Sequence, residues 1–415
     1  MQVFFYLINI VIILYAHRRF RDYLNPIFIL FVVWTGFSGA YELFSRFQSG
    51  YRILSETYYL YVSLFLYTFC IVSFFILRNV RKKSTINNGY FVNNLNISID
   101  SVNLILIIAI CANLFYILVL LVAGGSFNPI EAMSNIRALT RGDDPSSLAS
   151  IIKIPALLFN FTPLILAYIF MYKVKANNKI VFILMIEMFF ISFLLSTKGR
   201  IIRFTLLLLI MLKQKLSKRK FIFVSLVIIP VALFIMYTLV INRDRAYFDL
   251  FTMNDYLFVY FLSPIPGLDR LVCGELSYVT LGFGPRTLEY FYSLISGLIG
   301  SGVSNYVDPG YVRISTANGF VTSNVFTGLG LYYLDYKMIG AVVCAFFFSF
   351  VYTFVYKKMV RGKKGYAIFY VINFPYLLFH AFGDLIIGSI SITIQEFLSA
   401  IFLIYFVKKV RIRFG

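Results

Sequence analysis

The chain has 415 residues, of which 60% are hydrophobic, 19% aromatic and only 13% charged, a composition that predicts a polytopic membrane protein. Its formal net charge of +20 would suggest a nucleic-acid partner in a soluble protein, but the placement of the positive charges excludes that class. They gather in short stretches between apolar runs, as cytoplasmic loops of membrane proteins do. Six stretches carry 24 of the 38 Lys and Arg residues and one of the 18 acids: residues 17–22, 78–83, 173–179, 213–220, 357–364 and 408–413.

Apolar runs of membrane-spanning length recur along the chain, without the alternation of apolar and polar residues that a porin-like barrel needs. We therefore predict an all-α helical bundle, one membrane domain over residues 1–415, with its N-terminus outside and its C-terminus inside. The apolar N-terminus lacks a basic start and a clear cleavage site, so we expect a first span rather than a signal peptide. About eleven spans are expected, at residues 2–16, 24–44, 58–77, 102–123, 151–172, 180–197, 201–212, 221–241, 336–356, 366–387 and 390–407.

Three positive charges, Lys198, Arg200 and Arg203, lie between two apolar runs, where a membrane-spanning chain is expected to avoid charge. Basic stretches flank both runs, so the chain is expected to cross outward and return, with this turn on the outer side. Two full crossings need about 40 residues, at about 20 each. Residues 180–212 supply only 33. The turn is therefore expected at the outer membrane boundary, where it holds an anion.

The longest connection, residues 242–323, is expected on the outer side and contains five arginines but no lysine. The planar guanidinium of arginine suits bidentate binding of phosphate or carboxylate. Two segments, 256–266 and 288–299, are rich in aromatic and aliphatic residues and predict helices at the membrane interface. Arg243 and Arg245 follow a predicted span, so we expect them at the depth of the 198–203 turn, where the two helix ends clamp a diphosphate. The residues expected to bind the diphosphate are Lys198, Arg200, Arg203, Arg243, Arg245 and Arg286.

Two places on the outer side offer a general base. Glu275 lies in the arginine-containing loop, where the neighbouring positive charges keep a carboxylate ionised. His380 and Asp384 are four residues apart in the predicted span 366–387, so they are expected on one helix face. We favour Glu275, because a base in a loop can move with the substrate that it deprotonates.

Other polar residues receive simpler interpretations. Asp244 and Asp269 are the next candidates for the base if Glu275 and the histidine pair are not used. Glu187 and Glu396 lie within predicted spans and are expected to hydrogen bond between helices. The chain has two histidines and four cysteines without metal-ligand spacing, so neither a metal site nor a cofactor is expected.

Two motifs resemble those of Wzy-type O-antigen and oligosaccharide repeat-unit polymerases. Ser196-Thr197-Lys198-Gly199-Arg200, which closes a predicted span, is similar to the small-residue–Lys/Arg–Arg turn of that family. Asn324-Val325-Phe326-Thr327, followed by Tyr333-Leu334-Asp335 and Gly340, resembles its Asn-Val-Tyr-Thr … Tyr-x-Asp-Phe-Gly stretch. The chain departs from the family pattern at Asp335-Tyr336-Lys337, which stands in place of Asp-Phe-Gly.

The resemblance implies a metal-independent glycosyltransferase of the bacterial inner membrane with its active site facing the periplasm. Such an enzyme moves a growing glycan from undecaprenyl diphosphate onto a new lipid-linked repeat unit, and the outer arginines bind the leaving diphosphate. It also implies membrane lipid and a Wzz-type chain-length regulator as partners. Two alternatives stay open. An O-antigen ligase uses the same donor with lipid A core as acceptor, although ligases rely on a histidine in the large loop and residues 242–323 contain none. A transporter or flippase for the lipid-linked glycan is the alternative from another class.

Overall fold

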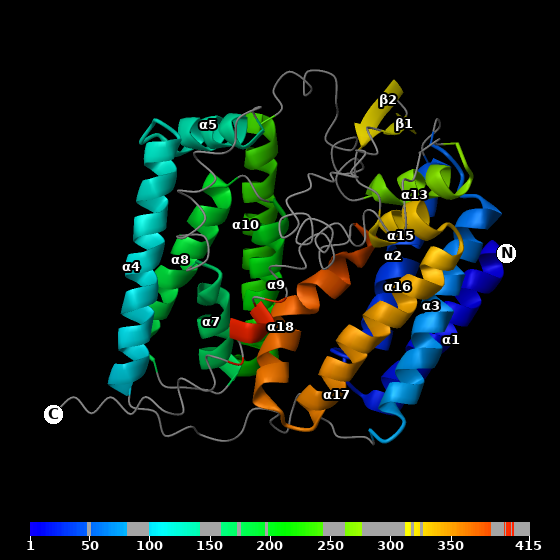
Figure 1. Ribbon diagram of the computed structural model, residues 1–415, viewed down its shortest axis with the longest axis horizontal. Helices are drawn as coiled ribbons and strands as arrows, with labels where there is room; N and C mark the ends of the chain where they lie inside the picture. Colours follow the sequence, from blue (N-terminus) through cyan, green and yellow to red (C-terminus); the bar gives the residue numbers. More distant parts are fainter. Residues whose placement is uncertain are drawn as a thin grey trace, which may run out of the picture. The chain divides into compact units, whose positions relative to one another are not determined.

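The structure of the chain, a computed structural model, is built from helices, with one β hairpin among the residues described (Figure 1). Its helical character agrees with the predicted fold class. The structure describes residues 1–47, 51–80, 99–141, 159–171, 176–195, 198–243, 262–275, 312–316, 319–323, 327–382, 394, 396–399 and 401.

Among the described residues, five helical segments are long and apolar enough to cross a membrane, which marks the chain as a membrane protein. Each coincides with a predicted span, whereas the total of eleven stays a prediction. The five segments are Gln2–Phe20, Pro26–Phe47, Glu56–Leu77, Val102–Ala123 and Ile339–Val360.

Two compact units make up the chain, and each combines segments that are distant in sequence. Helix α18 begins in the second unit, and its last residues belong to the first. The first unit contains α1 (Gln2–Phe20), α2 (Pro26–Phe47), α3 (Glu56–Leu77), α13 (Pro264–Val272), β1 (Val312–Thr316), β2 (Gly319–Ser323), α15 (Gly328–Tyr336), α16 (Ile339–Phe348), the π-helical η2 (Ser349–Thr353), α17 (Phe354–Val360) and the 3-10 turn η3 (Phe379–Ala381). The second contains α4 (Ile99–Ala123), α5 (Pro129–Arg141), α7 (Phe161–Met171), α8 (Asn178–Leu194), α9 (Lys198–Lys215), α10 (Lys218–Arg243) and the start of α18 (Lys364–Leu378).

Polar side chains begin the helices of the first unit. The Ser55 hydroxyl accepts a hydrogen bond from the Tyr58 backbone N–H (3.1 Å) and caps α3. The Asn25 side chain accepts from the Ile27 N–H (2.9 Å) where α2 begins, and Thr327 caps α15 in the same way. These caps satisfy donors that the first turn of a helix leaves unpaired.

Segments distant in sequence meet at each of the two ends of the first unit. At the basic end, the ammonium group of Lys357 in α17 donates to the Ile76 carbonyl of α3 (2.6 Å), and the Tyr356 hydroxyl donates to Asp22, just beyond α1 (2.7 Å). Three of the basic stretches, beginning near residues 17, 78 and 357, therefore share this end, as the positive-inside rule predicts. At the opposite end, the α13 end, α13 and α15 lie over the start of α3 (Figure 1). Which side of a membrane each end faces stays a prediction.

The long apolar helix after α15 begins later than predicted and changes its winding midway. The predicted span 336–356 is a helix from Ile339 to Val360, because Lys337 adopts a positive φ of 54° that ends α15 as a separate helix. Gly340 then packs against the carbonyl of Tyr332 so closely that no side chain would fit. In the π-helical η2, Thr353 hydrogen bonds with Ser73 of α3 (2.8 Å).

In the second unit, α9 and α10 form a helical hairpin, since only Leu216 and Ser217 separate them. Helix α10 has 26 residues and α9 has 18, a difference that corresponds to about 12 Å of helix at about 1.5 Å per residue. That Arg243 and the start of α9 lie at one depth in the membrane stays a prediction.

The long connection at residues 242–323 is described only in part. Helix α13 follows the predicted interfacial segment 256–266 and overlaps its last residues. An antiparallel hairpin that the sequence did not predict pairs Val312 with Ser323 and Thr316 with Gly319. The second predicted interfacial segment, 288–299, lies outside the described residues.

Candidate functional site

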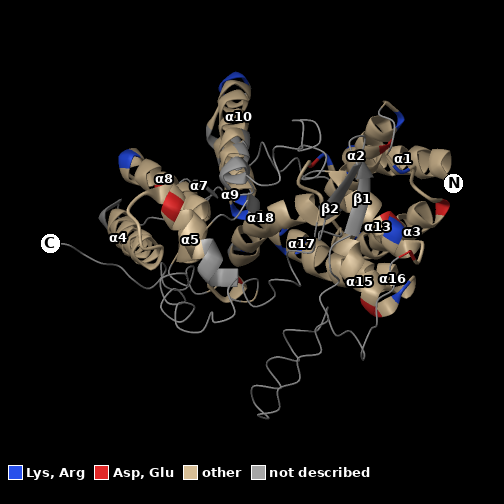
Figure 2. Ribbon diagram, turned by 90° about the horizontal axis from the view of Figure 1, so that it is seen from above, with Lys and Arg blue, Asp and Glu red and all other residues tan. Residues whose placement is uncertain are grey.

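The α13 end of the first unit carries a group of charged and polar side chains, the α13 cluster, made of Arg52, Ser55, Asp269, Arg270 and Glu275. In Figure 2, basic and acidic segments of the ribbon lie beside α13. Asp269 is fully buried. Its carboxylate accepts hydrogen bonds from Arg52 Nε (2.5 Å), the Ser55 backbone N–H (2.9 Å) and the Ser55 hydroxyl (2.5 Å). A buried carboxylate requires such donors, so Asp269 fastens α13 to the capped start of α3.

Glu275 lies at the solvent-accessible edge of the α13 cluster, with its side chain 36% exposed. Arg52 Nη1 lies 2.5 Å from Oε1, and Arg270 Nε lies 3.0 Å from Oε2. Burial by itself would raise the pKa of Glu275, but the hydrogen bonds and charges of the two guanidinium groups outweigh it and lower the pKa below its usual value. Glu275 is thus an ionised carboxylate held by arginines, as expected. The lowered pKa also makes it a weaker base than an ordinary carboxylate.

Arg52 is the residue of this site that the sequence did not reveal. Burial alone would lower its pKa, but hydrogen bonds to Asp269 and Glu275 raise it above the usual arginine value. Its backbone carbonyl accepts from the Tyr41 hydroxyl (2.7 Å), which fixes the connection between α2 and α3. A lone arginine in a short connection carries no sequence signal, because its two partners are more than 200 residues away.

His380 is a core residue of the first unit. It is fully buried; its ring stacks on Phe65 (4.9 Å between centroids), and its Nδ1 accepts from the indole Nε1–H of Trp34 (3.2 Å). This bond places the ring proton on Nε2, which faces the Cys344 sulfur at 3.8 Å. Gly328 lies so close to the ring that a Cβ there would come within 2.7 Å of His380 Cδ2.

Regular α-helix ends at Leu378, and a 3-10 turn carries His380. That His380 and Asp384 share one helix face stays a prediction. Asp384 itself lies outside the described residues.

In the second unit, Arg200 lies in the first turn of α9, within the turn that resembles the polymerase motif. Its guanidinium lies near Tyr116 of α4, and Nη1 is buried without a hydrogen-bond partner among the described residues. Lys198 is the first residue of α9, although its side chain lies outside the described part. A helix N-terminus with basic residues and no acid in its first turn favours an anion.

Arg203 has an internal partner instead. It is buried, its Nη2 lies 2.6 Å from Glu396 Oε1, and its Nε donates to the Ile372 carbonyl of α18 (3.3 Å). This arrangement confirms the expected hydrogen bond from Glu396 to another helix. It also gives Arg203 a structural role, while its role in diphosphate binding stays a prediction.

The second acid expected within a span behaves similarly. Glu187 of α8 is buried and accepts from the Asn113 amide of α4 (3.2 Å), and Asn113 in turn accepts from the Thr162 hydroxyl of α7 (3.2 Å). The expected hydrogen bond between helices is therefore confirmed. The polar chain holds three helices of the second unit together.

Three other predicted ligands of the diphosphate are not described at the side-chain level. Arg243 is the last residue of α10, but its side chain lies outside the described part, as do Arg245 and Arg286 entirely. Among the described residues, no three of His, Cys, Asp and Glu gather as metal ligands would.

No protein-family description, curated protein or solved structure matches this chain. The resemblance to repeat-unit polymerases therefore rests on the motif residues alone. The site must be interpreted from its own chemistry.

Proposed function

We propose that the chain is a membrane glycosyltransferase that extends a surface polysaccharide. It transfers a growing glycan from polyprenyl diphosphate to a new lipid-linked repeat unit at the outer face of the bacterial inner membrane. Two things support the proposal: the motifs at residues 196–200 and 324–340, and the state of Arg200, which is the observation that carries it.

Arg200 has the properties of a diphosphate ligand. Its Nη1 is buried and unpaired among the described residues. An unpaired buried donor costs free energy, which a phosphate oxygen would recover as a charge-assisted hydrogen bond. The unpaired N–H groups of the first turn of α9 carry a partial positive charge, which adds to the attraction of an anion by Arg200.

The proposed reaction makes one C–O bond and breaks another. A hydroxyl oxygen of the incoming repeat unit attacks the anomeric carbon of the donor glycan. The bond from that carbon to the diphosphate breaks, and its electron pair leaves with the diphosphate, where Arg200 stabilises the developing charge. The hydroxyl proton passes to a protein base.

Of the two predicted bases, Glu275 is the better candidate. Its carboxylate is ionised and partly exposed to solvent, so an acceptor sugar can reach it. His380 is fully buried and enclosed by aromatic rings. A proton acceptor must lie within hydrogen-bond reach of the hydroxyl that it deprotonates, which excludes the imidazole in this conformation.

The test compares Arg200→Lys with Arg219→Lys in the purified protein. Lysine keeps the charge at both sites but cannot reproduce bidentate contacts. Arg219 is the matched control because it is an exposed arginine at the start of α10, in a basic stretch assigned to the cytoplasm. With a defined polyprenyl-diphosphate-linked repeat unit as sole substrate, Arg200→Lys should lower the rate of chain extension by about 10- to 100-fold, and the control should retain the wild-type rate.

The products separate the competing functions. Glycans of several repeat units on polyprenyl diphosphate support the polymerase. Transfer that occurs only when lipid A core is added identifies a ligase. Movement of the substrate across a vesicle membrane without any new glycosidic bond identifies a transporter, and equal rates for the two variants would remove Arg200 from the site.

A further inference from the structure

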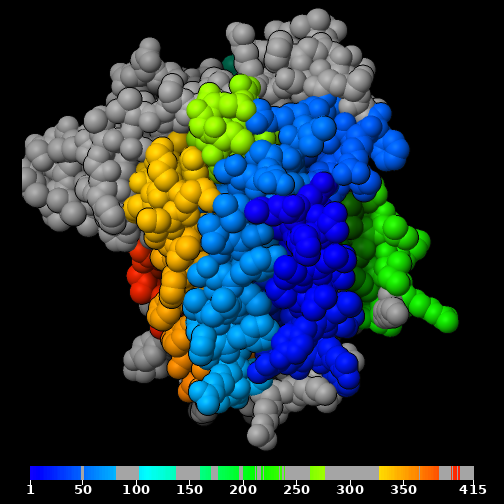
Figure 3. Space-filling view, turned by 90° about the vertical axis from the view of Figure 1, so that its right-hand side faces the viewer, coloured from blue at the N-terminus to red at the C-terminus, as the bar shows by residue number. Residues whose placement is uncertain are grey.

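A groove between the last turns of α1 and α3 lies at the basic end of the first unit, remote from the α13 cluster. The two helices run side by side on one face of this unit (Figure 3). The groove is open to its surroundings and has a volume of about 250 Å³. It is lined by three aromatic rings and two guanidinium groups: Tyr15, Arg19, Phe74, Phe75 and Arg78.

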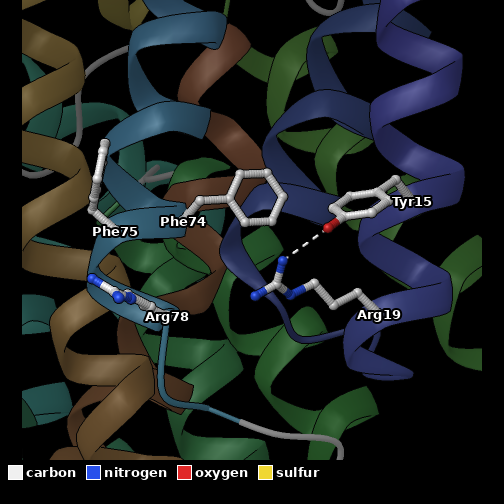
Figure 4. Close-up of a pocket in the computed structure, with 5 residues that line it drawn as sticks. All are labelled: Tyr15, Arg19, Phe74, Phe75 and Arg78. Carbon is white, nitrogen blue, oxygen red and sulfur yellow. Dashed lines mark hydrogen bonds between the residues drawn. The ribbon is translucent and has the colours of Figure 1, made fainter.

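Arg19 is held in place by its neighbours. Its Nη1 donates to the Tyr15 hydroxyl (2.8 Å), and its guanidinium carbon lies 5.3 Å from the centre of the Phe74 ring, which points from α3 toward α1 (Figure 4). The ring face attracts the cation. An arginine fixed in this way loses little conformational entropy when it binds a ligand.

Within the described part of the chain, no acid pairs with the positive charges of the groove. Among the ion pairs of the described residues, none involves Arg19 or Arg78. Asp22, the one acid in the nearby basic stretch, accepts hydrogen bonds from Tyr356 and from the Leu24 N–H. The groove therefore suits an anion.

The surroundings of the groove are apolar. Toward the middle of the two helices, the outer surfaces of α1 and α3 present aliphatic and aromatic side chains that a soluble protein would bury. The side chains nearest the groove that are more than half exposed are Val11, Leu14, Ile71 and Phe75. A ligand that fills the groove and continues along these surfaces must have a charged end and a long apolar part.

We propose that this groove binds an anionic glycerophospholipid of the leaflet at the basic end. Its phosphate lies against the Arg19 and Arg78 guanidinium groups, and its acyl chains follow the exposed faces of α1 and α3. Charge complementarity and the apolar faces together favour a lipid over a free phosphate ion, which would gain nothing from those faces. The site is independent of the proposed glycosyl transfer.

The test measures lipid binding to the purified full-length protein in uncharged detergent, by thermal stabilisation on titration with phosphatidylglycerol. The variant is the double substitution Arg19→Gln with Arg78→Gln. The control is Arg18→Gln with Arg361→Gln, which removes the same charge from exposed positions at the same end. Because each basic residue near the headgroup attracts an anionic lipid, the groove variant should weaken phosphatidylglycerol binding by at least about tenfold. The control should stay within about twofold.

Each other outcome overturns the proposal. Equal weakening in both double variants would mean diffuse attraction by the basic stretches rather than a defined groove. Equal stabilisation by phosphatidylcholine would mean that the headgroup charge is not recognised. Stabilisation by inorganic phosphate alone, removed by the groove variant, would identify a free-anion site. Unchanged phosphatidylglycerol binding in the groove variant would place the lipid elsewhere.

Discussion

Replacing Asp269 should weaken the attachment of α13 to α3, an effect on structure rather than on catalysis. In Asp269→Asn, the side chain keeps its shape and can still accept from Ser55, but its amide donors face the Arg52 N–H at the former 2.5 Å contact. Removing one partner of a buried ion pair costs about 3–5 kcal/mol. Because the Arg52 side chain is 29% exposed and can recover water, we expect about 2–3 kcal/mol.

That loss should appear as local opening of α13. At about 1.36 kcal/mol for each factor of ten, amide hydrogen exchange across Pro264–Val272 should accelerate about 30- to 150-fold. Hydrogen-exchange mass spectrometry in detergent measures this directly, with the amides of α16 as an internal reference. Exchange in α13 within about threefold of the wild type, in a protein that is otherwise folded, would refute the view that Asp269 fastens α13 to α3.

Three other substitutions test the remaining geometry. Arg203→Met alone should destabilise the protein by about 3–5 kcal/mol by leaving Glu396 charged and unpaired in the interior, and the double variant with Glu396→Leu should recover most of that loss in a denaturant titration. Gly328→Ala brings a Cβ within 2.7–2.9 Å of the imidazole and the backbone behind it and should cost about 1–3 kcal/mol, whereas Gly36→Ala, with open space around it, should be neutral or slightly stabilising. Glu275→Gln should slow chain extension by about 100-fold without loss of folding. In the wild-type protein, the ion pairs of Glu275 should stabilise the fold fully above the usual carboxyl pKa, and this stabilisation should disappear as the pH falls through the lowered pKa of Glu275.

The features that follow from local sequence were predictable. Long apolar runs located the five helices that can span a membrane, and the basic stretches identified one end of the first unit. The expectation that Glu187 and Glu396 bond to other helices followed from the cost of an isolated carboxyl in an apolar environment. These arguments need only the residue and its immediate neighbours in the chain.

The features that depend on tertiary contacts were not predictable from one sequence. Arg52 and Asp269 are in contact although they are 217 residues apart, and no sequence pattern near either residue predicts that contact. His380 was a candidate base because its place in a predicted span was known but its aromatic neighbours were not. Hydropathy also does not show that α10 is eight residues longer than α9.

The bond between Trp34 and His380 makes the first unit optically distinct. Trp34 is the only tryptophan in the 415 residues, and it is fully buried against Phe65. All indole emission of the protein therefore originates at one point in this unit, beside the imidazole that accepts its N–H. A change in the wavelength or lifetime of that emission would report movement of the η3 turn against α2, without an introduced dye and without interference from the second unit.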